Sequence, residues 1–379
     1  MYKQLSVLFT IILCITSGSV HALNYVESKN LLSLLEQEDF TRLESTLNSY
    51  FDAYEKDNKE ESNVDQALEA LNSNYEWMPD TISKWKQHSP DSYLPDLSLA
   101  LYHNKMGWES RGQKIMDETT KKQVDKMQFH FNNAKLNFNR ALNKKPDLLH
   151  AYAYLVNIAM TSRNNTEATR YYQQGLGINM YSKRMHLFYS FALLPRWGGS
   201  MEQLEKFSEL MTMLSKDNPQ LKSLIGVEDT EAGDQFFYAG KPAEALLHYL
   251  RAEKNGATWY LHMNMGDAYR QKGLYDDAKT HYQELISLRP MYAPAYYKLA
   301  QVLMLQNHHR EAMDVGKIAL EIDPDEYDYI TQQAQLYFNL DDYDNALKYV
   351  TIAKELNPDD NRLTMFTSII EMKQKNTKN

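Results

Sequence analysis

Small, bulky and helix-ending residues recur every 34 positions in the second half of the chain. Three prolines keep this spacing, each with an alanine twelve residues upstream: Pro290, Pro324 and Pro358, with Ala278, Ala312 and Ala346. Three further pairs place a small residue three positions before a bulky one: Gly266 and Tyr269, Ala300 and Leu303, Ala334 and Tyr337. Small residues let two helices approach closely, and proline cannot continue a helix. The pattern predicts a series of helix pairs.

The pattern extends one unit upstream, where Gly233 precedes Gly266 by 33 residues. Four repeats then span 226–360, and an amphipathic helix over 360–372 is expected to cover the last apolar face. Small residue, bulky residue, alanine and proline at these positions resemble the tetratricopeptide repeat. The resemblance implies an all-α, right-handed α-solenoid that binds other proteins.

The first half is less regular, but it also predicts helices. Ala100, Ala134 and Ala168 keep the 34-residue interval. The helix expected over 93–108 lies farther from its partner than in an ordinary repeat, which indicates an insertion through 117–123. No segment shows the alternation that a half-buried β-strand needs.

Upstream of that pair, residues 31–54 carry apolar side chains at helical spacing. The charged stretch 55–66 is interpreted as a solvated linker before a further helical segment at 67–77. The expected domains are a signal peptide at 1–22, an irregular helical domain at 23–225, and four repeats with a capping helix at 226–372.

The first 22 residues have the pattern of a secretory signal. Lys3 precedes an apolar run, and Val20-His21-Ala22 resembles a cleavage site. The run is shorter than the roughly 20 apolar residues of a membrane-spanning helix. A lipid anchor on Cys14 is the alternative, but Leu13 stands where such a signal has a small residue. We expect a mature chain that begins near Leu23 and is periplasmic or secreted, without a stable membrane anchor.

Composition narrows the function classes. The chain of 379 residues has a formal net charge of −9 and a single cysteine, Cys14, within the predicted signal. Acidic chains are poor partners for nucleic acid. The sequence contains no His-Glu-x-x-His, Gly-x-Ser-x-Gly or phosphate-binding glycine loop, and His308-His309 has no ligand at metal-binding spacing. We expect no catalysis, no cofactor and no metal.

Two segments stand out in the first half: Gly107-Trp-Glu-Ser-Arg-Gly112 and Leu194-Pro-Arg-Trp-Gly-Gly-Ser200. With their flanking helices, over about 30–215, they resemble a bacterial family of helical proteins with no established activity, which is sometimes found beside tetratricopeptide repeats. The Pro-Arg-Trp-Gly-Gly-Ser signature is the distinctive part. This resemblance implies an architecture and not a function.

The Trp-Gly-Gly-Ser corner has two interpretations. In the structural one, Ser200 caps a helix with help from Gln203, and Trp197 packs under a neighbouring repeat. In the functional one, the amides of Gly199 and Ser200 and the guanidinium of Arg196 bind an anion or a peptide carboxylate. The possible secondary site therefore consists of Arg196, Trp197, Gly199 and Ser200.

The resemblance to tetratricopeptide repeats implies that the first helix of each repeat lines an inner groove. The candidate partner-binding residues there are Asp234, Phe237, Tyr238, Tyr260, Asp267, Arg270, Tyr297, Gln301 and Phe338. Aromatic residues and arginine dominate binding energies at interfaces. The expected function is an exported, non-catalytic scaffold that binds a protein or peptide. The alternatives are an enzyme of unknown class, favoured if Glu109 lay beside Arg196, or a binder of cell-wall glycan, with a site between Trp108 and Ser200.

Overall fold

The computed structural model describes residues 23–112, 119–161 and 165–378, and within these ranges it consists of helices joined by turns. The predicted signal peptide and the first part of the predicted insertion lie outside the described residues. No described helix combines the length and the apolar character that crossing a membrane requires.

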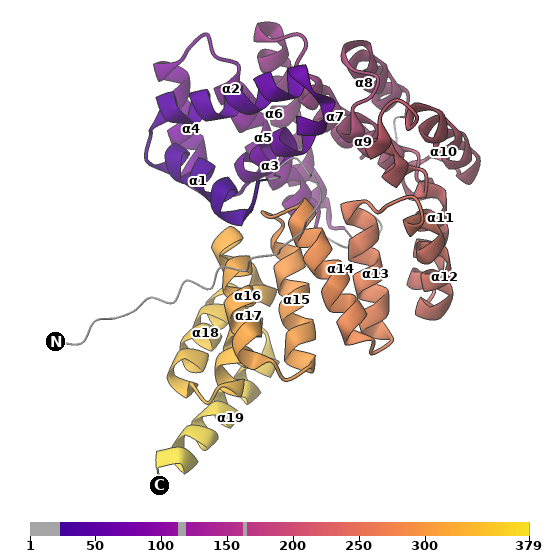
Figure 1. Cartoon of the computed structure of the whole chain (residues 1–379). Coiled ribbons are helices and arrows are strands. Elements are labelled where there is room, and N and C mark those ends of the chain that lie inside the picture. The colour runs from indigo at the N-terminus through magenta and orange to yellow at the C-terminus, as the bar shows by residue number, and fades with distance from the viewer. Residues whose placement is uncertain (1–22, 113–118, 162–164, 379) are drawn as a thin grey trace, which may run out of the picture.

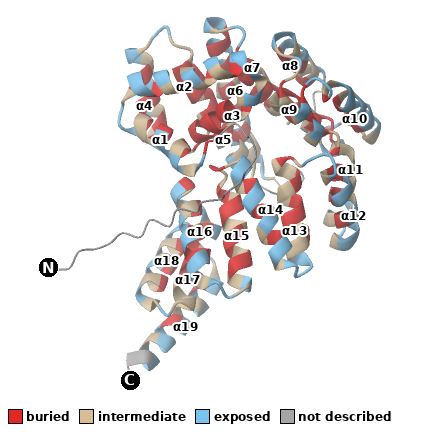
Figure 2. Cartoon of the chain, viewed as in Figure 1, coloured by how far each residue is buried: buried red, intermediate tan, exposed pale blue. Residues whose placement is uncertain are grey.

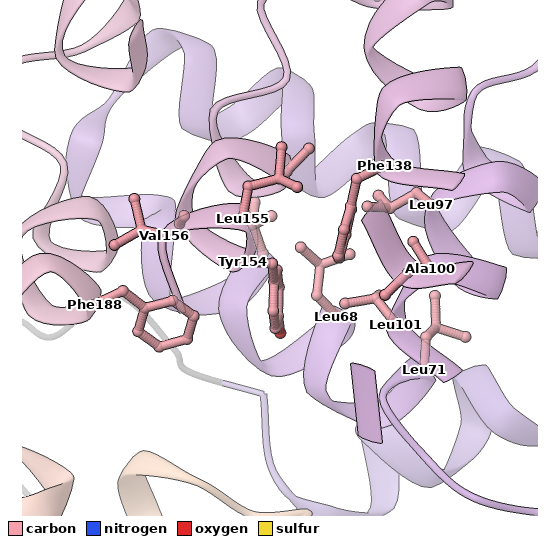
Figure 3. Packing of buried hydrophobic residues seen from close by; sticks show 14 of the residues in the cluster. Leu68, Leu71, Leu97, Ala100, Leu101, Phe138, Tyr154, Leu155, Val156 and Phe188 are labelled. Carbon is pink, nitrogen blue, oxygen red and sulfur yellow. The ribbon is translucent and has the colours of Figure 1, made fainter. Parts of the chain in front are cut away.

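The first half contains ten α-helices among the described residues, together with short 3-10 turns at Asn58–Glu60, Pro195–Trp197 and Pro219–Leu224. The helices are α1 (Tyr25–Glu36), α2 (Phe40–Lys56), α3 (Glu61–Leu71), α4 (Met78–His88), α5 (Leu94–Arg111), α6 (Lys121–Lys144), α7 (Leu149–Met160), α8 (Asn165–Ile178), α9 (Lys183–Ala192) and α10 (Met201–Leu214). Their buried side chains form one cluster around α3, α5 and α7, in which Phe138 stacks on Tyr154 (Figure 3).

The second half is a regular series of antiparallel helix pairs followed by one more helix. The helices are α11 (Val227–Tyr238), α12 (Pro242–Glu253), α13 (Trp259–Gln271), α14 (Tyr275–Leu288), α15 (Ala293–Leu305), α16 (His309–Ile322), α17 (Tyr327–Asn339), α18 (Tyr343–Leu356) and α19 (Asn361–Lys378). Figure 1 shows the chain running from the upper arch of α1–α10 down through α11 and α12 and back beneath that arch through α13–α19. The fold is an all-helical α-solenoid, as predicted.

The repeat residues pack as the period predicts. Ala278 and Ala312 are fully buried, which confirms their place at helix contacts. A Cβ atom added to Gly266 would lie 2.5 Å from the ring of Tyr282, and one added to Gly233 would lie 2.3 Å from the ring of Tyr249. Glycine therefore lets an aromatic ring of the second helix lie directly on the backbone of the first.

Residues 31–54 are helical apart from a turn at 37–39, where Glu38 has a φ of 60° and Asp39 caps the start of α2. One expectation for the first half is wrong. The stretch 55–66 is not a solvated linker, because α3 begins there and Glu61 is buried. The Glu61 carboxylate accepts hydrogen bonds from the backbone amide of Lys183 (2.7 Å) and the hydroxyl of Ser182, at the start of α9.

The two halves meet along a seam between α3 and the turns that join the later repeats. Arg289 at the end of α14 donates to Glu69 of α3, with an Nε to Oε1 distance of 2.8 Å. Gln66 donates to the backbone oxygens of Ser287 and Leu288, both at 3.3 Å, and Tyr75 donates to the backbone oxygen of Glu321 at 2.6 Å. The solenoid therefore closes on itself.

Apolar packing follows the same seam. The buried cluster of the first half continues into α15, α16 and α17 through Tyr296, Ile322 and Tyr329. In Figure 2 the buried residues gather around α3 and α5, whereas α10 and α12 carry many exposed ones. This cluster contains side chains from both sides of the domain division expected between residues 225 and 226. The division itself stays a prediction.

Candidate partner-binding groove

The structure joins the predicted groove to the Trp-Gly-Gly corner through one group of hydrogen bonds and ion pairs, which we call the Arg196 cluster: Arg196, Glu231, Asp234 and Tyr260. Arg196 lies in the 3-10 turn before α10, and its guanidinium contacts Asp234 of α11 at 3.3 Å and the hydroxyl of Tyr260 of α13 at 2.9 Å. Tyr260 in turn donates to Asp234 at 2.5 Å. Residues that the sequence analysis assigned to two separate sites thus share one network.

Both carboxylate oxygens of Asp234 accept hydrogen bonds from other residues of the chain. The second oxygen accepts from Tyr249 at 2.8 Å and from Asn264 at 2.7 Å. Burial opposes the charge of the Arg196 guanidinium, but the nearby Tyr260, Asp234 and Glu231 raise its pKa above the ordinary value. Asp234 therefore positions Arg196 and offers no free base.

The negative charge of Asp267, the second acid of the predicted groove, is also balanced by a cationic side chain. Asp267 lies on α13 and accepts from the hydroxyl of Tyr282 at 2.6 Å. Lys298 of α15 donates to both of its oxygens, at 2.8 and 2.9 Å. Because each acid has a cationic partner, the groove is less negative than the sequence alone indicates.

The remaining groove residues differ in exposure. Tyr238 is 72% exposed at the end of α11, beside the half-buried Phe237. Arg270 on α13 and Tyr297 and Gln301 on α15 are also half-buried. The ring of Tyr297 lies 5.0 Å from that of Tyr329. These side chains form the accessible part of the predicted set.

Phe338 is placed differently from the rest of the set. Its ring lies 5.4 Å from Phe366 of α19 and 5.8 Å from Tyr343. The C-terminal helix thus packs on the last repeat at this residue, which matches the capping helix expected over 360–372. Phe338 contributes to that packing more than to an open surface.

The corner itself is built from side chains that contact one another. The rings of Trp197 and Trp108 meet edge to face at 6.1 Å, and the guanidinium of Arg111 lies 5.1 Å from the centre of the Trp197 ring. The two segments that stood out in the sequence therefore meet in space. Trp108 also donates its ring N–H to Asn157 at 2.9 Å.

Two of the groups proposed for an anion site at this corner, the Gly199 amide and the Arg196 guanidinium, have partners within the chain. The amide of Gly199 donates to the backbone oxygen of Leu194 at 3.1 Å. A Cβ atom on Gly199 would lie 1.9 Å from the oxygen of Leu193, which explains the glycine. Ser200 caps α10 by accepting from the amide of Gln203 at 3.2 Å, as expected. The Gln203 side chain meets the Ser200 hydroxyl (3.5 Å), so the expected capping box is half formed.

A position of Glu109 beside Arg196 would have favoured the enzyme alternative, but Glu109 contacts other residues. It contacts the ammonium of Lys105 at 2.8 Å and accepts from Asn74 at 2.9 Å. The acids beside Arg196 are Asp234 and Glu231 instead. Neither the position nor the partners of Glu109 provide the arrangement that the enzyme alternative required.

One hollow was not anticipated from the sequence. It has a volume of about 550 Å³ and lies between α6, α7 and α8, lined by Asn139, Leu142, Asn143, Pro146, Tyr152, Arg170, Tyr171 and Gln174. Arg170 lies over the ring of Tyr171 at 4.3 Å. Its lining comes from three helices with no distinctive local pattern, so only the tertiary packing reveals it.

Family models for tetratricopeptide repeats match three segments of the chain. One described as "TPR repeat" matches residues 266–307, and two described as "Tetratricopeptide repeat" match residues 230–278 and 327–360.

Several solved structures match the chain at low sequence identity and low TM-score. In the APC/C hetero-tetramer Cut9–Hcn1, the match has 14% identity and a TM-score of 0.41, and it covers 91% of this chain and 62% of that one. PilF of Pseudomonas aeruginosa matches at 14% identity with a TM-score of 0.36, and the match covers 72% of this chain and 98% of PilF. YrrB, described as a TPR protein with an unusual peptide-binding site, matches at 15% identity with a TM-score of 0.30. That match covers 61% of this chain and 97% of YrrB. Together with the helix pairs and their glycine–aromatic contacts, the family matches show that residues 230–360 are built of tetratricopeptide repeats.

Proposed function

We propose that this chain is an exported, non-catalytic scaffold that binds a protein or peptide along the groove of its tetratricopeptide repeats. The observation that carries the proposal is the row of accessible aromatic and arginine side chains on successive first helices: Tyr238 on α11, Arg270 on α13 and Tyr297 on α15. Residues of these types dominate binding energies when a partner covers them.

The compensated acids favour a peptide or protein segment as the occupant. Asp234 is paired with Arg196 and Asp267 is paired with Lys298, so the two carboxylates present little uncompensated negative charge to a partner. Hydrogen bonds within the Arg196 cluster and between Asp267 and Lys298 hold the side chains of the proposed groove wall in fixed positions. A wall that is ordered before binding loses less conformational entropy when the partner arrives.

Export is proposed from residues 1–22 alone. Their apolar run and small residues before Leu23 have the pattern of a cleaved signal. N-terminal sequencing of the protein from the periplasm or the culture medium should give Leu23 as the first residue. Recovery of Met1, or of a lipid on Cys14, would contradict it.

Cross-linking in living cells followed by mass spectrometry should identify the partner. The triple variant Tyr238→Ala, Arg270→Ala and Tyr297→Ala should then weaken binding of that partner at least about 100-fold, because three contact residues are lost together. The matched control is Phe129→Ala, which removes an aromatic ring that is 60% exposed on α6 and remote in sequence from the repeats. Circular dichroism should show the same helical content in all variants.

The same experiment separates the groove from the corner. Arg196→Ala does not discriminate between them, because Arg196 contacts both Asp234 and Tyr260 of the groove. Arg111→Gln does, since Arg111 stacks on Trp197 and donates its hydrogen bond to the backbone oxygen of Gly112. Unchanged binding by the triple variant, with binding lost in Arg111→Gln, would move the site to the first half and revive the enzyme or glycan-binding alternative.

A further inference from the structure

Three potential metal ligands converge where the first two repeats meet: Glu253, His262 and His281. They come from the end of α12, from α13 and from α14. One ligand atom from each lies within 4.8 Å of the other two. The Nδ1 atoms of the two histidines are 3.0 Å apart, and Nδ1 of His281 is 4.0 Å from Oε1 of Glu253.

These distances suit a small tetrahedral ion. Bonds of roughly 2.0–2.1 Å to a central Zn²⁺ at tetrahedral angles place neighbouring ligand atoms about 3.3 Å apart. The Nδ1 atoms of the two histidines are slightly closer together than that, and the Glu253 carboxylate oxygen is farther away, at 4.0 Å from Nδ1 of His281. Two imidazoles and one carboxylate form a ligand set that Zn²⁺ uses when it keeps a fourth position open.

The ligand side chains are not sealed from solvent. The side chain of His281 is 12% exposed and that of Glu253 is 35% exposed, so an ion can enter from solvent.

A second histidine pair in the first half shows what the same contact looks like without the acid. The Nδ1 atoms of His103 on α5 and His130 on α6 are also 3.0 Å apart. The ring planes meet at 40° there and at 39° in the His262–His281 pair. Among the described residues, only the pair in the repeats has a third ligand in range. The two pairs therefore allow a comparison between a histidine pair alone and a histidine pair with a carboxylate beside it.

We propose that Glu253, His262 and His281 bind one Zn²⁺ ion, with the fourth position open to water, and that the ion ties the first tetratricopeptide repeat to the second. The carboxylate belongs to the second helix of one repeat, and both imidazoles belong to the next repeat. Because the ion binds the folded arrangement only, it should also stabilise this junction. The inference is independent of the proposed partner-binding groove.

The test uses untagged full-length protein freed of metal with a chelator. Zn²⁺ titration by calorimetry should show one strong site, and Co²⁺ in its place should give the visible absorption of tetrahedral coordination. Glu253→Gln and His281→Gln should each weaken Zn²⁺ binding about tenfold or more. His130→Gln, the matched change in the other pair, should leave the affinity unchanged. Glu253→Gln keeps the shape of a half-exposed side chain, so the variant is expected to fold.

The thermal midpoint gives a second readout. Added Zn²⁺ should raise the midpoint of the wild-type protein and of His130→Gln, and it should not raise that of Glu253→Gln. Absence of Zn²⁺ and Co²⁺ binding by the wild-type protein would overturn the proposal. So would binding that survives both Glu253→Gln and His281→Gln, or that is lost equally in His130→Gln.

Discussion

The two halves of this chain are both helical, but they use different contacts to hold their helices together. In the repeats, the buried side chains fall largely into separate clusters, each made by neighbouring helices: one around Tyr249 and Leu261, one around Tyr282 and Leu303, and one around Ile330 and Val350. In the first half, a single cluster extends from α1 to η4 at 219–224 and onward into α15–α17.

Polar contacts show the same difference. In the first half, Asn179 donates to Tyr54, 125 residues away, and Glu61 accepts from Lys183, 122 residues away. In the repeats, Asp267 is held by Tyr282 and Lys298, which are 15 and 31 residues away. A solenoid made of nearest-neighbour contacts is expected to lose order locally. The irregular half, and the repeats that touch it, should instead lose order together.

The largest expected effect comes from a cavity in the irregular half. Phe138→Ala removes a fully buried ring and should lower the free energy of unfolding by about 3–5 kcal/mol. Because the cluster continues into α15–α17, hydrogen exchange should speed up there as well as in α6. Phe129→Ala on the same helix is the control. An effect confined to α5–α7 would show that the two halves are independent.

A smaller effect is expected at the seam. Glu69→Ala leaves the guanidinium of Arg289 without its carboxylate and should cost about 1.5–3 kcal/mol in urea denaturation. Arg289 also lies over the rings of Trp259 and Tyr292, at 4.3 and 4.2 Å, so its position is fixed. Asp229→Ala, which breaks the exposed pair with Arg251 inside the first repeat, should cost at most about 1 kcal/mol. Equal effects of the two variants would argue against a closed solenoid.

The smallest expected effect is an acid dependence that starts in the first half. His186 accepts from Tyr172 at 2.7 Å and donates to the oxygen of Met180 at 2.9 Å, and burial lowers its pKa from 6.5 to about 4. The unfolded chain takes up this proton at higher pH than the folded chain. Stability from His186 is thus complete above pH 6.5 and falls as the pH drops toward 4.

His186→Gln should reduce the loss of stability between pH 6.5 and pH 5.5 by about 1 kcal/mol. Urea titrations at pH 6.5 and 5.5 measure the difference. His308→Gln changes an exposed histidine and should keep the wild-type slope. If both variants follow the wild-type slope, His186 does not carry the predicted dependence.

The candidate sites were predicted unevenly. The repeat period placed Tyr238, Arg270 and Tyr297 on successive first helices, and their role in binding stays a prediction. The contacts of Arg196 with Asp234 and Tyr260 could not be predicted from the sequence, because the three residues belong to separate helices and turns. The expectation of no metal stays untested, and the ligands of the proposed Zn²⁺ site could not be found from the sequence for a similar reason. Glu253, His262 and His281 keep no recognisable ligand spacing, and only the junction of two repeats brings them together.

Glu61 shows why a charged stretch misled the sequence analysis. Charged residues are normally solvated, so 55–66 was interpreted as a linker. The start of α9 supplies the donors that a buried carboxylate needs, and burial together with the nearby Asp65 raises the pKa of Glu61 to about 7. The donors at Ser182 and Lys183 lie some 120 residues away, where no local pattern could connect them with Glu61.

By itself, the sequence determined the helix pairs of the second half, their small contact residues and the cap at the end. These features follow from contacts within about one repeat, which the 34-residue period encodes directly. Only the tertiary structure decided that the solenoid closes through Glu69 and Arg289, 220 residues apart. Closure depends on the small rotations of every helix pair added together, and no single segment of the chain contains that sum.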